Sequence, residues 1–130
     1  MDYHDTRQYL LGRPESFEDF PFGPDVAVFK IATKMFATLV QAEGIARMNL
    51  KCDPHEAAIL RDIFSAVIPG YHMNKKHWNT IHLDYHVNKN LVEEWIIDSY
   101  NLDYFTEAAI GFMKFGVEHR RRLPYGTLEF

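Results

Sequence analysis

The stretch IARMNLKCDPHEAAILRDIF, residues 45–64, decides the fold class because a strand pattern runs directly into a helix pattern. In its first half apolar and polar residues alternate. The apolar set is Ala46, Met48, Leu50 and Cys52, and the polar set is Arg47, Asn49 and Lys51. A period of two predicts a β-strand with one buried side and one side facing solvent.

The second half of the stretch carries the signals of a helix start. Asp53 stands at the cap position, Pro54 at the first helical position and Glu56 three residues after the cap. This order predicts a capping box and a helix that begins at residue 54. The residues expected to form its buried stripe are Ala57, Leu60, Ile63 and Phe64.

Working outward, the flanking segments predict more strands and two more helices. Residues 26–32 and 34–40 read as two strands before this one, and residues 77–83 as a fourth, with Trp78, Thr80 and His82 on one side. Residues 2–12 and a segment capped by Asn88 read as helices, and the Pro/Gly-rich residues 13–25 as an ordered loop. Helices on one face of an antiparallel sheet whose other face is wet define an α+β fold.

The bulk composition sets limits on the class of protein. The chain has 130 residues, a net charge of −4 and a hydrophobic fraction of 47%, which fit a single globular domain. One cysteine excludes an internal disulfide, and neither a secretion signal nor a run long enough to span a membrane is evident. We therefore expect a cytoplasmic protein without membrane partners, and the negative charge disfavours a dedicated nucleic-acid binder.

Three stretches resemble one known family. They are FPFGPDVAVFKIATKMFA (20–37), MNLKCDP (48–54) and IPGYHMNKKHWNTIHLD (68–84), whose order and spacing are similar to those of the MmcQ/YjbR family of small bacterial proteins. The resemblance covers roughly residues 2–102. It implies a CyaY-like (frataxin-like) fold, also called a double wing, and a DNA-binding role that rests on fold analogy. It divides the chain into a domain at 1–102 and an extension at 103–130, helical to about residue 115 and then frayed.

Iron binding is not carried over from the frataxin-like fold. Frataxin-like proteins hold iron on an acidic first helix, whereas the first predicted helix here has only Asp2 and Asp5. The carboxylates Glu15, Glu18 and Asp19 follow in the predicted loop. We therefore expect no metal and no cofactor.

Four histidines raise the alternative of a metal site or a catalytic site. His72, His77, His82 and His86 are spaced by five, five and four residues. Strand alternation places His77 and His82 on opposite faces, which opposes shared coordination. No nucleophile–base spacing or phosphate-binding loop accompanies them, and Cys52 lies on the inward side of its strand. The sequence therefore predicts no catalytic residues and a binding protein rather than an enzyme.

Positive and aromatic residues near residue 75 form the predicted binding site. Its members are Lys51, Tyr71, His72, Asn74, Lys75, His77 and Trp78. Lysines with planar rings suit a phosphate and a stacked base, so DNA is the first expected partner. The alternative is a module that binds a protein or an anionic small ligand. The basic run HRRR at 119–122 is expected to be a solvated tail.

Overall fold

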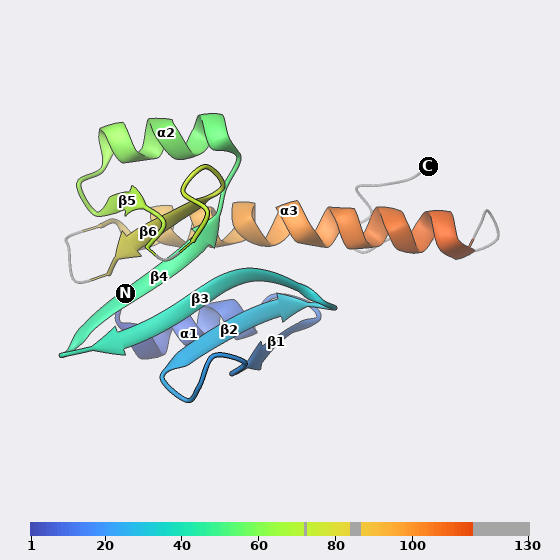
Figure 1. Ribbon diagram of the computed structural model, residues 1–130, viewed down its shortest axis with the longest axis horizontal. Helices are drawn as coiled ribbons and strands as arrows, with labels where there is room; N and C mark the ends of the chain where they lie inside the picture. The colour runs from blue at the N-terminus through green and yellow to red at the C-terminus, as the bar shows by residue number, and fades with distance from the viewer. Residues whose placement is uncertain (72, 84–86, 116–130) are drawn as a thin grey trace.

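The computed structural model describes residues 1–71, 73–83 and 87–115. Within them the chain forms three helices and six strands (Figure 1). In order these are α1 (Tyr3–Leu11), β1 (Ser16–Asp19), β2 (Val26–Ile31), β3 (Lys34–Ala42), β4 (Ile45–Lys51), α2 (Pro54–Ile63), β5 (Val67–Pro69), β6 (Trp78–His82) and α3 (Lys89–Phe115). The α+β class expected from the sequence is confirmed.

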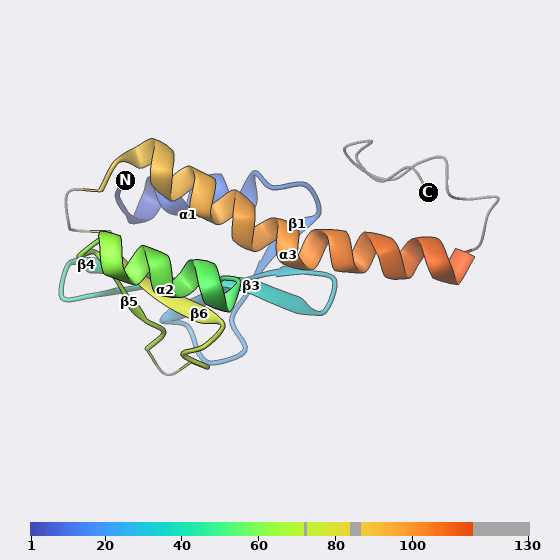
Figure 2. The same cartoon turned by 90° about the horizontal axis from the view of Figure 1, so that it is seen from above.

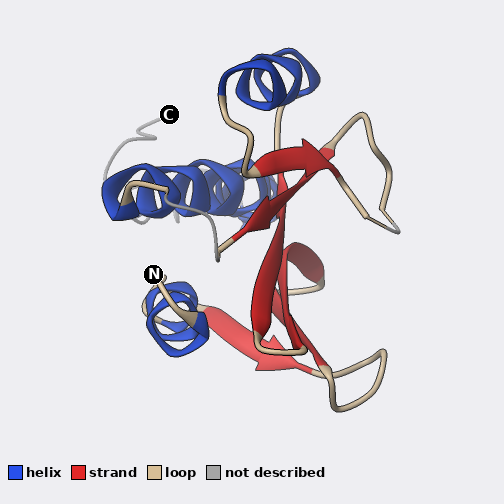
Figure 3. Cartoon of the chain, turned by 90° about the vertical axis from the view of Figure 1, so that its left-hand side faces the viewer, coloured by secondary structure: helices blue, strands red, loops and turns tan. Residues whose placement is uncertain are grey.

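All six strands belong to one antiparallel sheet with the order β1-β2-β3-β4-β6-β5. The helices lie along one face of the sheet, and the other face carries only loops (Figure 3). α2 and α3 run beside each other on the helix-covered face, and α3 continues past the end of the sheet (Figure 2). The sheet therefore has one helix-covered face and one open face.

Local sequence signals explain where the helices begin. The Asp2 side chain caps α1 by accepting from the backbone N–H of Asp5, and the Asp53 carboxylate caps α2 by accepting from the N–H groups of His55 and Glu56. The Asn88 side chain accepts from the N–H of Asn90 at 2.8 Å, at the start of α3. Each cap satisfies backbone donors that the first helical turn leaves unpaired.

The core lies between the helices and the covered face of the sheet. Every second residue of the strands points into this core, and Phe29, Leu39 and Met48 among them are fully buried. The sequence pattern of α3 predicts an inner face of Leu91, Val92, Trp95, Ile96 and Ser99. The last four are at most 8% exposed, and Leu91 is half-buried against the core. This packing holds α3 on the central strands β2, β3 and β4.

Two short edge strands were not expected from the sequence. β1 lies inside the segment predicted to be a loop, and β5 lies next to the expected Pro-Gly turn. Both are four residues or fewer and pair on one side only, so they lack the long alternation that identifies an inner strand. Pro69 is tolerated because an edge strand can lack one ladder N–H.

Two expectations about burial were wrong. Ile63 was placed in the buried stripe of α2 but is 64% exposed, because the helix ends at this residue and the chain turns away toward β5. The open face is also less wet than expected. Val28, Thr38 and Thr80 point to that face, yet each is at most 4% exposed.

Candidate binding site on the open sheet face

Two loops project from the open face of the sheet (Figure 3): residues 20–25 and the 70–77 loop, of which the structure describes residues 70–71 and 73–77. Together with the strands they enclose a groove of about 430 Å³. Its apolar lining consists of Phe22, Val26, Met35, Val40, Tyr71 and Met73. Its polar lining consists of Thr38, Arg47, Asn49 and Thr80. A concave apolar surface with a few polar groups is the usual character of a ligand site.

Aromatic rings from the two loops stand at the groove. Phe22 is 69% exposed and Tyr71 is 54% exposed, which is unusual for rings of this size. The guanidinium carbon of Arg47 lies 5.5 Å from the centroid of the Tyr71 ring, within the range of a cation–π contact. Arg47 thus brings a permanent positive charge to a predominantly apolar groove.

Strand register explains why the polar groups meet on the groove floor. Asn49 of β4 pairs with Thr38 of β3 on one side and with Thr80 of β6 on the other. The Thr80 hydroxyl donates to Oδ1 of Asn49 and accepts from the backbone N–H of Tyr71 at 2.8 Å. These bonds fix the start of the 70–77 loop to the floor of the groove.

Internal hydrogen bonds shape the 70–77 loop. Nζ of Lys75 donates to the carbonyl of Gly70 at 3.1 Å, and Oδ1 of Asn74 accepts from the N–H of Lys76 at 2.9 Å. The carbonyl of Asn74 accepts from the N–H groups of His77 and Trp78. Two residues of the predicted site, Asn74 and Lys75, therefore contribute to the shape of the groove wall.

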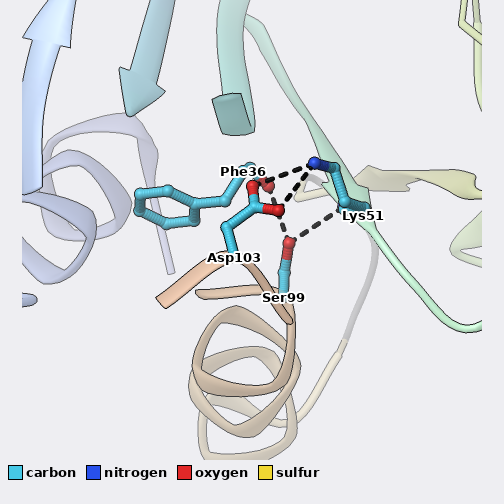
Figure 4. A network of polar contacts seen from close by, with 4 residues as sticks. All are labelled: Phe36, Lys51, Ser99 and Asp103. Atoms are coloured by element: carbon cyan, nitrogen blue, oxygen red, sulfur yellow. Dashed lines mark hydrogen bonds and ion pairs between the residues drawn. The ribbon is translucent and has the colours of Figure 1, made fainter. Parts of the chain in front are cut away.

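Lys51 lies at a different place from Tyr71. Its Nζ is 2.9 Å from both carboxylate oxygens of Asp103 on α3, a residue only 5% exposed (Figure 4). The Ser99 hydroxyl donates to the carbonyl of Phe36 and accepts from the N–H of Lys51. Lys51 is thus part of the contact between α3 and the sheet, and it lines a second cleft between α2 and α3.

The structure brings the predicted site residues into separate groups. Trp78 is buried at 7% exposure, with Nζ of Lys51 at 5.5 Å from its ring. His77 is exposed, and its carbonyl accepts from the N–H of Cys52 at 2.7 Å. His72 lies outside the described residues. Of the six predicted residues that the structure describes, only Tyr71 lines the groove on the open face.

Several groove residues were missed by the sequence analysis. Arg47 and Asn49 were correctly assigned to the outer row of their strand but were not joined to the site. Phe22, Met35 and Met73 reach the groove from a loop, from β3 and from a second loop. Only the strand order and the loop paths bring these residues together, and neither is visible in local periodicity.

Cys52 lies in the cleft between α2 and α3, away from the groove. Burial raises the pKa of its thiol to about 11, with further increases from the carboxylates of Glu56, Asp53 and Asp98. A thiol with this pKa is almost fully protonated near neutral pH and is a weak nucleophile. Among the described residues, which do not include His72 and His86, no cluster of three or more metal-ligating side chains is found.

Comparison with known proteins identifies the family. The YjbR family model matches residues 11–102. The chain belongs to the YjbR family. The Escherichia coli O157:H7 protein called uncharacterized protein YbdF is 40% identical over 83 residues, which cover 64% of this chain and 68% of that protein. The uncharacterized protein YjbR of E. coli strain K12 is 30% identical over 84 residues, covering 65% of this chain and 71% of that protein.

Solved structures of YjbR-like proteins share the fold. A Deinococcus radiodurans protein, DR2400, described by its domain DUF419, has a TM-score of 0.72 at 30% identity and covers 98% of this chain and 95% of its own. A Pseudomonas syringae protein has a TM-score of 0.71 at 27% identity and covers 78% of this chain and 98% of its own. In the part of the YjbR-family chain that the structure describes, no helix has the length and apolar character needed to cross a membrane.

Proposed function

We propose that this YjbR-family protein is a binding module whose open-face groove takes an organic anion with a planar or apolar body. The observation that carries the proposal is the position of Arg47. Its guanidinium stands over the Tyr71 ring in a groove otherwise lined mainly by apolar side chains. Such a groove supplies apolar area for the body of a ligand and one fixed charge for its acidic group.

Three lysines are already paired within the chain, which favours a ligand of low charge over a polyanion. Lys51 is paired with Asp103, and Lys30 with Asp19 at 2.9 Å. Nζ of Lys75 is engaged by the carbonyl of Gly70. Three lysines that could have met a phosphate backbone therefore interact within the chain, and the net charge of −4 adds a general repulsion of polyanions.

Single-stranded DNA is the second candidate, and one observation favours it. The exposed rings of Phe22 and Tyr71 stand at the same groove as Arg47, and bases stack on such rings. Exposed Lys76 lies in the loop that forms one wall. The CyaY-like, double-wing description fits this candidate, with the 20–25 and 70–77 loops as the two wings. In either case we place the protein in the bacterial cytoplasm.

A matched pair of dyes tests the proposal. Anilinonaphthalene sulfonate has an apolar planar body and one negative charge, and N-phenyl-1-naphthylamine has a similar body without the charge. We expect both to bind the full chain, measured by fluorescence titration. Arg47→Ala should weaken binding of the sulfonate by at least about tenfold, since a hydrogen bond to a charged group contributes about 1.5–3 kcal/mol. The uncharged dye should bind the variant as before.

Arg13→Ala is the control. Arg13 also stacks on a tyrosine, since its guanidinium carbon lies 4.1 Å from the Tyr9 ring centroid, but it lies outside the groove. It should leave both affinities unchanged. Failure of the sulfonate to bind, or equal losses in the two arginine variants, would rule out the groove as an anion site.

Salt dependence separates the two candidates. Between 50 and 200 mM salt, the affinity for a single-stranded oligonucleotide held by four phosphates should fall about fiftyfold. A ligand held through one charge should lose only about threefold. Anisotropy titration with a labelled oligothymidine therefore decides for DNA if it binds tightly with the steep slope, and against DNA if it does not bind at 50 mM salt.

A further inference from the structure

The cleft between α2 and α3 lies on the opposite side of the sheet from the groove and encloses about 520 Å³. Its floor is apolar, and the four floor residues are each at most 8% exposed: Leu50 of β4, Val67 of β5, Ile81 of β6 and Trp95 of α3. The two helices add Leu60 and Leu102, which are less buried. A cavity of this volume with an apolar lining has the size of a small-molecule site.

Three exposed carboxylates border this apolar floor. Glu56 belongs to α2, and Glu94 and Asp98 belong to α3. Glu94 and Asp98 are four residues apart on one helix, so they are neighbours on its surface. Partial burial raises the pKa of Asp98, and the charges of Glu94 and Glu56 raise it further. Carboxylates of the two helices therefore repel one another across the cleft, and a cation that enters relieves this repulsion.

Two cations of the chain lie near the cleft, and both have partners of their own. Lys51 lines it, and the charge of Arg61 acts on Cys52 inside it. Nζ of Lys51 is 2.9 Å from the carboxylate of Asp103, and Arg61 donates to Oδ1 of Asn79 at 2.8 Å. Among the salt bridges of the described residues, none includes the three bordering carboxylates. The cleft thus combines an apolar floor with a negative charge that no side chain of the described residues neutralises.

We propose that this cleft binds an organic amine with an apolar body, which covers the floor near Trp95 while its ammonium group meets the bordering carboxylates. A primary ammonium has three donors and can satisfy carboxylates from both helices. A metal ion fits less well, because in the part of the chain that the structure describes no three metal-ligating side chains lie close enough to share one. This site is separate from the open-face groove and takes a ligand of the opposite charge.

A matched pair of naphthalene compounds tests the proposal. Naphthylethylamine is a cation near neutral pH, and naphthylethanol has the same body without the charge. Each is titrated into the isotope-labelled full chain at low salt, and amide NMR signals report both the affinity and the place of binding. The amine should shift the signals of Cys52, Glu56 and Asp98 to saturation. It should bind about tenfold more tightly than the alcohol, because each exposed carboxylate contributes about two- to threefold.

Two variants that lose the same charge make the test specific. Glu56→Gln/Glu94→Gln/Asp98→Asn should bind the amine about tenfold more weakly and the alcohol as before. Because these changes remove mutual repulsion, the variant should melt close to the temperature of the parent chain, so a loss of affinity reports on charge. The control is Asp5→Asn/Asp25→Asn/Glu43→Gln, at exposed positions outside the cleft, and it should leave both affinities unchanged.

Four outcomes would overturn the proposal. The first two are absence of binding at millimolar amine and equal affinities for the amine and the alcohol. The third is an equal loss of amine affinity in the two triple variants, or shifts confined to groove residues such as Arg47 and Tyr71, since the amine would then bind elsewhere. The fourth is movement of the cleft signals with protein concentration in the absence of amine, because a second copy of the chain would then fill the cleft.

Discussion

The two faces of the sheet use the same strands in different ways. On the covered face large side chains such as Phe29 are fully buried, and polar groups such as Ser99 have specific partners. On the open face two rings, Phe22 and Tyr71, stand in solvent beside a groove. The contrast indicates that the covered face holds the fold together and that the open face is available for recognition.

Truncation of a ring on each face should give the largest contrast. Phe29→Ala removes a fully buried ring and should reduce the free energy of unfolding by about 3–5 kcal/mol. Phe22→Ala removes a ring that is 69% exposed and should change it by less than about 1 kcal/mol. Urea denaturation measures both values. Comparable losses would mean that the open face also carries the fold.

Lys51 sharpens the comparison because the sequence assigned it to binding and the structure pairs it with buried Asp103. Lys51→Ala leaves that carboxylate without its partner and should cost about 2–3 kcal/mol of stability. Lys76→Ala, at an exposed lysine, should cost almost nothing. Neither change should alter sulfonate binding by more than twofold. If the Lys51 variant kept normal stability but bound the sulfonate more weakly, Lys51 would be a binding residue and not a structural one.

Gly70 connects the two faces because it lies at the start of the groove wall and against Trp78. A Cβ at this position would stand 2.8 Å from Cβ and 2.9 Å from the carbonyl oxygen of Trp78. Gly70→Ala should therefore cost about 1–3 kcal/mol and displace the loop, whereas Gly12→Ala, with nothing closer than 3.3 Å, should be tolerated. Thermal melts compare the two. A stable Gly70 variant would show that the loop can move without loss.

The smallest expected effect is the pH dependence of stability that comes from the Cys52 thiol. The folded pKa of Cys52 is about 11, above the value of 9.0 for an ordinary thiol. The favourable contribution of the protonated thiol is therefore complete below pH 9 and is lost as pH rises from 9 to 11. Alkylation rates should rise through pH 10 in the native chain but level off near pH 9 in urea. A native plateau near pH 9 would contradict burial of the thiol.

The sequence predicted what depends on local pattern. The Asp53 cap, the alternation of β4 and the inner face of α3 follow from spacing, and each is confirmed. The family motifs also indicated the YjbR family correctly. These features depend on neighbouring residues, so a single chain segment carries the whole signal.

The groove could not be predicted in the same way. Its residues come from two loops and four strands, and β4 neighbours β6 although α2 and β5 intervene in the chain. The sequence grouped Lys51 with Lys75 because both are basic, whereas Asp103, 52 residues further along, binds Lys51. Whether the division at residue 102 marks a domain stays a prediction, and α3 passes through that point without interruption.

The hydroxyl of Thr80 determines the polarity of the groove floor. A hydroxyl has a single proton to donate. The Thr80 hydroxyl donates it in a hydrogen bond to Oδ1 of Asn49 and accepts a hydrogen bond from the backbone N–H of Tyr71. The amide of Asn49 is therefore oriented, with its oxygen toward Thr80 and its NH₂ group directed away from that bond. Together with the guanidinium of Arg47, this floor presents donors and favours ligands that bring an acceptor. A single threonine thus fixes the orientation of the Asn49 amide on the groove floor.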